Sequence, residues 1–354
     1  MASGMLLGQV GACQEKVGVA MDGMRVFDLH CDTLDRLCLH DYPAYPGFAR
    51  QNASEGIPLD RLQSLKDNDG HISLDRMGDH PWCQCFAIFV PDKLMPDDSW
   101  ELFTHVNNFF TRQMQEHSSL VEQVRDGRNI QTVLASGKKV ALLTVEGAPF
   151  FWGPETLWRV DELAQAGVMM VTLTWNGPNA IASGIETQSG IKPFGRDVIA
   201  ALEGKHIIID ASHLNDQSFT DLLTCAQRPF AASHSNARSV CGHPRNLQDW
   251  QFKEIAQRGG IVGLNFYNDF LIDDKRDATP DEVLLHIEHW LELDGQDALA
   301  LGSDYDGSDV PTWLHGCEKM EVLYALVGDR FGGEIANKLF FENAQRFFSE
   351  YARS

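Results

Sequence analysis

Five short apolar runs in this chain each lead into side chains of the types that bind metal ions. They are Val26–Leu29 before His30 and Asp32, Ala141–Val145 before Glu146, Ile207–Ile209 before His213, Pro229–Ala232 before His234, and Leu299–Leu301 before Asp304. Short apolar or β-branched runs are typical of buried strands. In a parallel α/β barrel, polar residues just beyond the C-terminal strand ends carry the chemistry. The pattern therefore predicts both a barrel and a metal-dependent hydrolytic site.

Strand and helix patterns alternate along the whole chain. The strand candidates lie at residues 25–30, 82–90, 139–146, 168–174, 206–211, 229–234, 260–266 and 298–303. Helical spacing of apolar residues marks Trp100–Val124, Glu155–Ala166, Asp281–Leu293 and Glu334–Tyr351. This alternation predicts a parallel sheet with right-handed crossovers. Eight strands, without a glycine-rich dinucleotide-binding loop, favour a closed (β/α)8 TIM-like barrel over an open sheet. We expect a binuclear metal site at its C-terminal strand ends.

The length and composition fit one domain. The chain has 354 residues, of which 44% are hydrophobic, and an α/β barrel with insertions reaches this length. We expect a single metal-dependent hydrolase domain over residues 24–354. Residues 1–23 lack the basic start and apolar stretch of a signal peptide, so we interpret them as a disordered leader, with an upstream start-site extension as the alternative. Residues 41–81 are rich in Pro, Gly, Asp and Asn, which predicts an irregular, partly helical insertion near the barrel mouth.

The charge balance disfavours some classes of partner. With 50 acidic and 29 basic residues the formal net charge is −21, which opposes binding to nucleic acid or an anionic membrane. No apolar run is long enough to span a bilayer. The eight cysteines are too few for a disulfide-rich scaffold, and several, including Cys31, Cys83, Cys85 and Cys225, adjoin apolar runs. We expect them to be reduced and buried, as in a cytoplasmic protein.

The candidate metal ligands fall into two groups. His30 and Asp32 lie two residues apart, so in an extended chain they point to the same face. His213 and His234 each follow a serine at the end of successive strands and should converge at one rim of the barrel. Imidazole and carboxylate are normal zinc ligands, and Glu146 has two oxygens with which to bridge two ions. Zinc is the expected metal, and Glu146 could bridge two such ions, although sites of this kind also take manganese, cobalt or iron.

Two further residues suit catalysis and substrate binding. Asp304 follows the last strand, where a carboxylate can take a proton from water and pass it to a leaving amine. Asp306 is the alternative for that role, or else an aspartate that stabilises the turn. Arg245, in a loop after His234, suits bidentate capture of a substrate carboxylate. The alternative is a salt bridge to one of the many acidic residues.

These segments together resemble the membrane (renal) dipeptidase family of the amidohydrolase superfamily, in its bacterial-type form. The resemblance covers nearly the whole chain from Met24. It rests on Asp28–Thr33, Glu146–Ala148, Asp210–His213, Ser233–Arg238, His243–Asn246, Asn265–Tyr267 and Gly302–Gly307. Family members cleave dipeptides, often with a D-residue at the C-terminal position, and many form homodimers. The resemblance implies the same for this chain.

The resemblance also implies roles for individual residues. One zinc ion would be held by His30, Asp32 and the bridging Glu146, and the other by Glu146, His213 and His234. Asp304 matches the family's proton-shuttling aspartate, and Arg245 matches the arginine that binds the substrate's C-terminal carboxylate. Tyr267, in the matching segment after the seventh strand, is a further substrate-binding candidate.

One segment departs from the mammalian pattern. Mammalian members carry a histidine in a Thr-Leu-Thr-His run after the fourth strand, where it is thought to bind the substrate carbonyl oxygen. This chain has Trp175 at that position, followed by Asn176, as bacterial-looking members do. The Trp175 indole N–H and the Asn176 side chain are therefore the candidates for contacting the substrate there.

The resulting hypothesis is a zinc-dependent dipeptidase in which a metal-bridging hydroxide attacks the peptide carbonyl. One alternative is another amidohydrolase acting on N-acyl amino acids, lactones or cyclic amides with the same metals. A second is a non-catalytic barrel that binds a metal or a peptide. The presence of Asp304 beside all five candidate ligands argues against the second alternative, because a binding module needs no proton shuttle.

Overall fold

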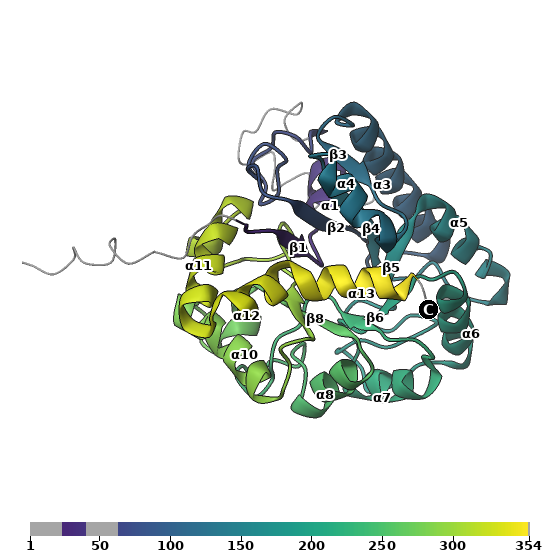
Figure 1. The fold of residues 1–354 in the computed structure, drawn as a ribbon. Coiled ribbons are helices and arrows are strands. Elements are labelled where there is room, and N and C mark those ends of the chain that lie inside the picture. The colour runs from purple at the N-terminus through teal and green to yellow at the C-terminus, as the bar shows by residue number, and fades with distance from the viewer. Residues whose placement is uncertain (1–22, 40–62, 353–354) are drawn as a thin grey trace, which may run out of the picture.

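Parallel strands close into a barrel in the computed structural model, which describes residues 23–39 and 63–352 (Figure 1). The barrel strands are β1 (Val26–Asp28), β2 (Trp82–Phe89), β4 (Lys139–Glu146), β5 (Val168–Thr172), β6 (Ile208–Asp210), β7 (Ala231–Ala232), β8 (Ile261–Leu264) and β9 (Leu299–Leu301). They pair in the order β2-β1-β9-β8-β7-β6-β5-β4, and β2 pairs with β4 to close the ring. The predicted (β/α)8 barrel is confirmed, and each of its strands lies within its predicted segment.

One additional strand was not predicted. The expected helix over Trp100–Val124 is wrong at its C-terminal end, because α3 (Pro96–Glu116) stops at Glu116. The chain then forms β3 (Val121–Gln123), which pairs with the first residues of β4. β5 pairs with the later residues of β4, so β3 and β5 lie one after the other along the same edge of β4. β3 is stabilised by pairing with β4, a strand that comes later in the sequence. The spacing of apolar residues within residues 100–124 cannot indicate this pairing, because it is a purely local signal.

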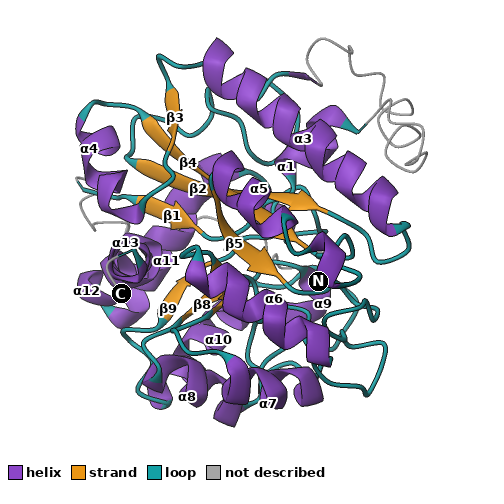
Figure 2. Cartoon of the chain, turned by 90° about the vertical axis from the view of Figure 1, so that its right-hand side faces the viewer, coloured by secondary structure: helices purple, strands orange, loops and turns teal. Residues whose placement is uncertain are grey.

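Helices cover the outside of the barrel (Figures 1 and 2). Besides α3 they are α1 (Thr33–Cys38), α4 (Ile130–Ala135), α5 (Arg159–Ala166), α6 (Pro193–Gly204), α7 (Asp216–Cys225), α8 (Asp249–Gln257), α9 (Asn268–Leu271), α10 (Pro280–Glu292), α11 (Met320–Phe331), α12 (Gly333–Asn337) and α13 (Asn343–Tyr351). α10 matches its prediction within a residue at each end. The predicted closing helix is α12 and α13 joined by a π-helical turn at Lys338–Glu342.

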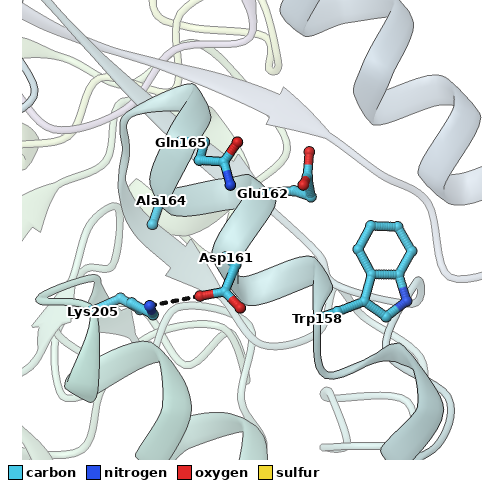
Figure 3. A pocket seen from close by; sticks show the side chains of 6 residues that line it. All are labelled: Trp158, Asp161, Glu162, Ala164, Gln165 and Lys205. Carbon is cyan, nitrogen blue, oxygen red and sulfur yellow. Dashed lines mark ion pairs between the residues drawn. The ribbon is translucent and has the colours of Figure 1, made fainter.

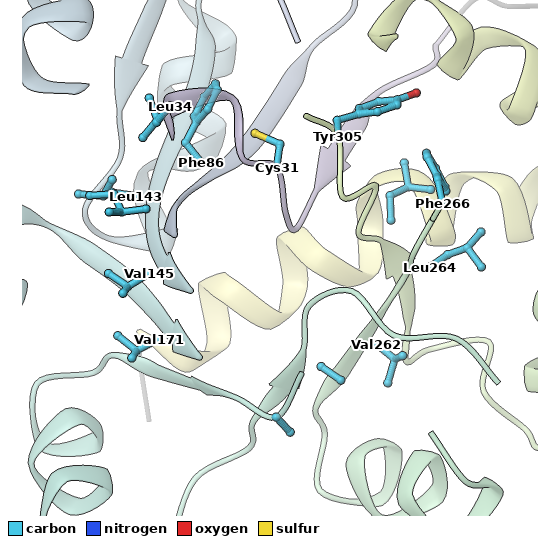
Figure 4. Close-up of a cluster of buried hydrophobic side chains, with 14 of the residues drawn as sticks. Cys31, Leu34, Phe86, Leu143, Val145, Val171, Val262, Leu264, Phe266 and Tyr305 are labelled. Atoms are coloured by element: carbon cyan, nitrogen blue, oxygen red, sulfur yellow. The ribbon is translucent and has the colours of Figure 1, made fainter. Parts of the chain in front are cut away.

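The apolar core has two layers, because successive strand side chains point to opposite faces. In β4, Leu143 and Val145 belong to the cluster between barrel and helices (Figure 4). Val140 and Leu142 belong to a second cluster, which gathers residues from every barrel strand together with aromatic residues of α13. In Figure 1, α13 lies across the centre of the ring of strands. It therefore closes the end of the barrel opposite the C-terminal strand ends.

Some predictions concern residues outside the described part of the chain. The expected leader lies there apart from Gly23, and so do residues 41–62 of the expected insertion. The described remainder of that insertion, residues 63–81, consists of turns and bends. The described cysteines are all free thiols; six are buried, as expected, but Cys225 is only half-buried. Among the described helices, none has the length and apolar character needed to cross a membrane.

Candidate metal centre and active site

The five predicted metal ligands and Asp304 meet at the C-terminal ends of the strands, and all six are buried. His30, just beyond β1, points its Nε2 toward three carboxylates. That nitrogen lies 3.3 Å from Asp32 Oδ2, 3.6 Å from Glu146 Oε2 and 3.9 Å from Asp304 Oδ1. Side chains from three strand ends therefore share one small volume.

Two further imidazoles approach the other oxygen of Glu146. His213 Nε2 lies 2.6 Å from Glu146 Oε1 and 3.0 Å from His234 Nε2, while His234 Nε2 lies 3.7 Å from Glu146 Oε1. Glu146 thus presents Oε2 to His30 and Oε1 to the histidine pair. Its carboxylate stands between two groups of ligand-type atoms.

This cluster has the character of a cation site. His30 Nε2 and Asp32 Oδ1 are buried and have no hydrogen-bond partner. Ligand atoms of His30, Glu146 and His234 lie within 4.8 Å of one another, as do those of His30, Asp32 and Asp304. Nitrogen and oxygen donors in this mixture suit zinc and related divalent ions. The residues present therefore fit the metal that the sequence predicts.

The electrostatics support the same interpretation. Burial, reinforced by Arg245 and His30, lowers the pKa of His213 and His234 well below the usual value, and neutral imidazole is the form that binds metals. Burial and the charge of Asp32 raise the pKa of Glu146 well above its usual range. Burial opposes protonation of His30, but the charges of the surrounding carboxylates outweigh it and raise its pKa to about 10. This carboxylate cluster therefore attracts a positive charge.

The outer nitrogens of the two imidazoles are held by neighbouring side chains. His213 Nδ1 lies 2.9 Å from Asn176 Oδ1, and His234 Nδ1 lies 2.7 Å from Ser233 Oγ. The Ser233 hydroxyl donates to the buried Asp210 carboxylate at 2.5 Å, so it accepts from His234. Such partners fix the tautomer and keep Nε2 directed inward. Sequence reasoning missed this role of Ser233, although a serine before each histidine was the available signal.

Backbone strain is concentrated at the same place. His213 and Asp304 adopt left-handed conformations with φ of 71° and 60°, which is uncommon outside glycine and often marks functional sites. Gly147, directly after Glu146, has φ of 83°, and a Cβ there would lie 2.4 Å from the carbonyl oxygen of Val90. Glycine is therefore required immediately after the central carboxylate.

The structure separates the two candidate aspartates of the last loop. Asp304 Oδ2 accepts from Asn265 Nδ2 at 3.0 Å, and Oδ1 faces the His30 cluster. The fully buried side chain of Asp306 instead accepts from the His71 backbone N–H at 2.6 Å and the Thr33 hydroxyl at 2.5 Å. Asp306 therefore fastens the 63–81 segment to the barrel, which fits its interpretation as a structural aspartate.

A cavity of about 820 Å³ opens above the cluster. Its walls include all four predicted substrate-binding residues, Arg245, Trp175, Asn176 and Tyr267. Trp175 packs edge-on against Phe89 with 5.2 Å between the ring centroids, and the Tyr267 hydroxyl donates to Asp269 at 3.1 Å. Asn176 both lines the cavity and holds His213.

Arg245 is the notable cation of this cavity. It is buried, its Nε has no hydrogen-bond partner, and its Nη2 makes only a long contact of 3.4 Å with the carbonyl oxygen of His234. Within the described ranges, no carboxylate lies at ion-pair distance from its guanidinium. Burial lowers its pKa to about 10, so it is still charged at neutral pH. The salt-bridge alternative for Arg245 therefore finds no partner there.

A second pocket lies on the outer surface, away from the strand ends (Figure 3). It is formed by α5, the adjoining Trp158, and Lys205 just after α6. Lys205 is paired with Asp161 at 2.6 Å. Nothing in this pocket resembles the ligand cluster of the barrel mouth.

A (β/α)8 barrel whose strand ends gather imidazoles and carboxylates has the architecture of a metal-dependent hydrolase. The chain belongs to the membrane dipeptidase family, peptidase family M19, whose family model matches residues 15–354. Members of this family are metallopeptidases, so the chain is a peptide-bond hydrolase with a metal cofactor, as predicted.

Individual relatives agree with this membership. The chain is 25% identical over 363 residues to dipeptidase tcpJ of Claviceps purpurea, covering 98% of this chain and 81% of that protein. An uncharacterised Klebsiella pneumoniae protein is 39% identical over 181 residues, which span 48% of this chain and 66% of the relative.

Solved structures show the same fold. The crystal structure of dipeptidase AC, a metallopeptidase of family M19, has a TM-score of 0.82 and 25% identity, covering 94% of this chain and 99% of that one. A Rhodobacter sphaeroides metallopeptidase, crystallised with a phosphinate mimic of L-Ala-D-Ala, has a TM-score of 0.81 and 24% identity, covering 92% and 99%.

Proposed function

We propose that this protein is a zinc-dependent dipeptidase that cleaves free dipeptides, including those with a C-terminal D-residue. The observation that carries the proposal is the position of Glu146, whose two oxygens face His30 on one side and the His213–His234 pair on the other. On this view His30, Asp32 and Glu146 hold one zinc ion, and Glu146 with the two histidines holds a second. Two bound zinc ions supply Lewis acidity and lower the pKa of water.

The remaining steps belong to side chains of the chain itself. Asp304 takes the proton of the attacking water and delivers it to the departing amine; Asn265 holds one of its oxygens, which leaves the other facing the cluster. Arg245 binds the substrate's C-terminal carboxylate through its guanidinium, whose Nε has no hydrogen-bond partner and whose Nη2 makes only a long contact with the His234 carbonyl oxygen. With one end of the substrate fixed, the distance from Arg245 to the ligand cluster selects two-residue substrates.

The test is hydrolysis of a small panel before and after zinc is restored to chelated protein. The panel contains L-Ala-L-Ala, L-Ala-D-Ala, Gly-D-Phe, an N-acetylated dipeptide and a tripeptide. Zinc-restored cleavage of the free dipeptides alone is the expected result, and cleavage of the two D-residue substrates checks the stereochemical part. Cleavage restricted to neutral amides, lactones or N-acyl amino acids would replace this proposal with the other amidohydrolase activity.

The role of Arg245 is tested separately. Arg245→Ala should reduce kcat/KM for dipeptides far more than for neutral amides, because only dipeptides carry the carboxylate. Arg245→Lys is the matched control, since it keeps the charge and loses the bidentate fork.

Light scattering of the same preparation tests the homodimer that the family resemblance implies.

A further inference from the structure

A second buried carboxylate in the wall of the cavity is only half satisfied. Asp35 lies in α1, one turn after Asp32, and is fully buried. Its Oδ2 accepts from the backbone N–H of Phe89 at 2.6 Å, while its Oδ1 has no hydrogen-bond partner. An unpartnered buried carboxylate oxygen is unfavourable unless a donor reaches it. Because Asp35 lines the cavity, that donor can come from a ligand.

The carboxylates nearby are already assigned. Asp304 is held by Asn265, and Asp306 is occupied by His71 and Thr33. Asp32 also has an unpartnered oxygen, but its other oxygen belongs to the His30 cluster. Asp35 forms no part of either candidate ligand group. Burial and the charge of Asp32 raise the pKa of Asp35 well above its usual range, and a cation beside Oδ1 would relieve both effects.

Asp35 and Arg245 lie on opposite sides of the barrel mouth. The partner of Asp35, Phe89, ends β2, and the guanidinium of Arg245 lies against the carbonyl of His234, which follows β7. In the ring, β1, β9 and β8 separate β2 from β7 on one side, and β4, β5 and β6 separate them on the other. The two strands are therefore diametrically opposed. The cluster of ligand-type side chains lies between the buried carboxyl group of Asp35 and the buried guanidinium of Arg245.

From this arrangement we propose that Asp35 is the binding site for a substrate ammonium group, across the metal centre from the carboxylate site at Arg245. This assignment rests on the proposed dipeptidase function. An ammonium group brings three N–H donors and a positive charge. It would therefore give Asp35 Oδ1 the hydrogen-bond donor that it does not have within the protein. Two parts of a dipeptide can supply it: the α-ammonium of the N-terminal residue, or a basic side chain on that residue.

The experiment compares Asp35→Asn with the wild-type zinc-loaded protein on three substrates. Asparagine keeps an oxygen for the Phe89 N–H and removes the charge. The substrates are L-Ala-L-Ala, L-Lys-L-Ala and propionyl-L-Ala, in which the ammonium is absent. We expect kcat/KM of the variant to fall about 10- to 100-fold for ammonium-bearing substrates, the range for a hydrogen bond to a charged group, and to change little for propionyl-L-Ala.

The substrates distinguish the two sources of the ammonium. Equal losses for L-Ala-L-Ala and L-Lys-L-Ala assign the α-ammonium, and a loss confined to L-Lys-L-Ala assigns the side chain. No loss for either, or an equal loss that includes propionyl-L-Ala, overturns the proposal. Asp309→Asn is the control, because it removes one charge from an exposed position in the wall of the same cavity and measures the non-specific effect of charge.

A wild-type measurement keeps the test independent of how the variant folds. Wild-type kcat/KM for at least one of L-Ala-L-Ala and L-Lys-L-Ala should exceed that for propionyl-L-Ala by about tenfold or more, and equal values for all three substrates would overturn the proposal. Failure of the underlying function looks different, because the wild-type protein would then cleave no dipeptide. If the wild-type protein cleaves dipeptides and Asp35→Asn cleaves them equally well, the ammonium-site proposal is wrong and the proposed dipeptidase function still holds.

Discussion

The carboxylate of Asp28 accepts two hydrogen bonds from Ser303, one from its backbone N–H at 2.8 Å and one from its hydroxyl at 2.6 Å. Asp28 ends β1, and Ser303 lies beyond the end of the neighbouring β9. Gln84 donates to the same carboxylate at 2.8 Å. This buried aspartate therefore fixes the backbone directly before Asp304.

The same pair of hydrogen bonds, from a serine to a buried aspartate, occurs on the other side of the barrel. Asp210 ends β6 and accepts from the Ser233 N–H at 2.8 Å and from its hydroxyl at 2.5 Å, directly before His234. In both places a buried aspartate on one strand holds a serine that follows the next strand around the ring. The serine in turn positions a side chain of the candidate site.

We expect Ser303→Ala to lower kcat for dipeptides by about 10- to 100-fold, the usual range for a supporting residue around a metal site. The change removes the hydroxyl bond to Asp28 and loosens the backbone before Asp304, so KM and metal content should stay near wild type. Ser233→Ala is the matched comparison, and it should weaken metal binding because Ser233 holds His234 Nδ1. Metal titration beside steady-state kinetics separates the two effects, and identical behaviour of the two variants would contradict this assignment.

Asp304→Asn should reduce turnover by about 10² to 10⁴-fold, the contribution of a positioned general base. The amide cannot accept and return a proton, yet its shape allows the Asn265 contact to persist. Metal content measured by atomic absorption should remain near that of the wild-type protein. Loss of metal from the variant, or normal turnover, would show that Asp304 has another role.

Metal removal should destabilise the protein as well as inactivate it. The described cluster gathers the carboxylates of Asp32, Glu146 and Asp304 around His30, and a cation offsets their mutual repulsion. Zinc at about a thousandfold excess over its dissociation constant would add about 4 kcal/mol to the free energy of unfolding. Scanning calorimetry of chelated and zinc-restored protein measures the shift. Magnesium, which prefers oxygen ligands, is the control and should restore less.

The strands and the ligand cluster could be predicted because both depend on local sequence. A short apolar run identifies a buried strand, and the parallel closure of the barrel then brings the residues after every strand to one rim. The close approach of His30, Glu146, His213 and His234 was predicted in this way, without knowledge of any contact. The apolar alternation in β4 follows from the same periodicity.

Other features depend on contacts between distant segments. β3 exists because Val121–Gln123 pairs with residues at the start of β4, which the spacing within residues 100–124 does not reveal. Asp304 faces the ligand cluster while Asn265 donates to its other oxygen, whereas Asp306 accepts from the backbone N–H of His71. These contacts come from distant segments and distinguish the two aspartates. The burial of Asp35 and its hydrogen bond from the Phe89 backbone N–H likewise arise only because β2 lies beside α1.

Stability at acidic pH should depend on His286, a fully buried residue of α10. Its Nδ1 accepts from the backbone N–H of Ala237 at 3.2 Å, and its Nε2 lies 3.0 Å from the carbonyl oxygen of Leu271, to which it donates. The neutral ring satisfies both contacts, whereas protonation of Nδ1 would break the first. Burial lowers the pKa of His286 to about 4, from an ordinary value of 6.5.

The lowered pKa fixes the direction of the effect. Between pH 6.5 and about 4 the unfolded chain binds a proton at His286 that the folded protein does not, so the stabilising contribution is complete above pH 6.5. It is lost as the pH falls toward 4, by roughly 1 kcal/mol per pH unit. His286→Gln does not titrate, so its urea midpoint should fall less steeply over this range than that of the wild type. Parallel curves for the two proteins would show that His286 is not the group responsible.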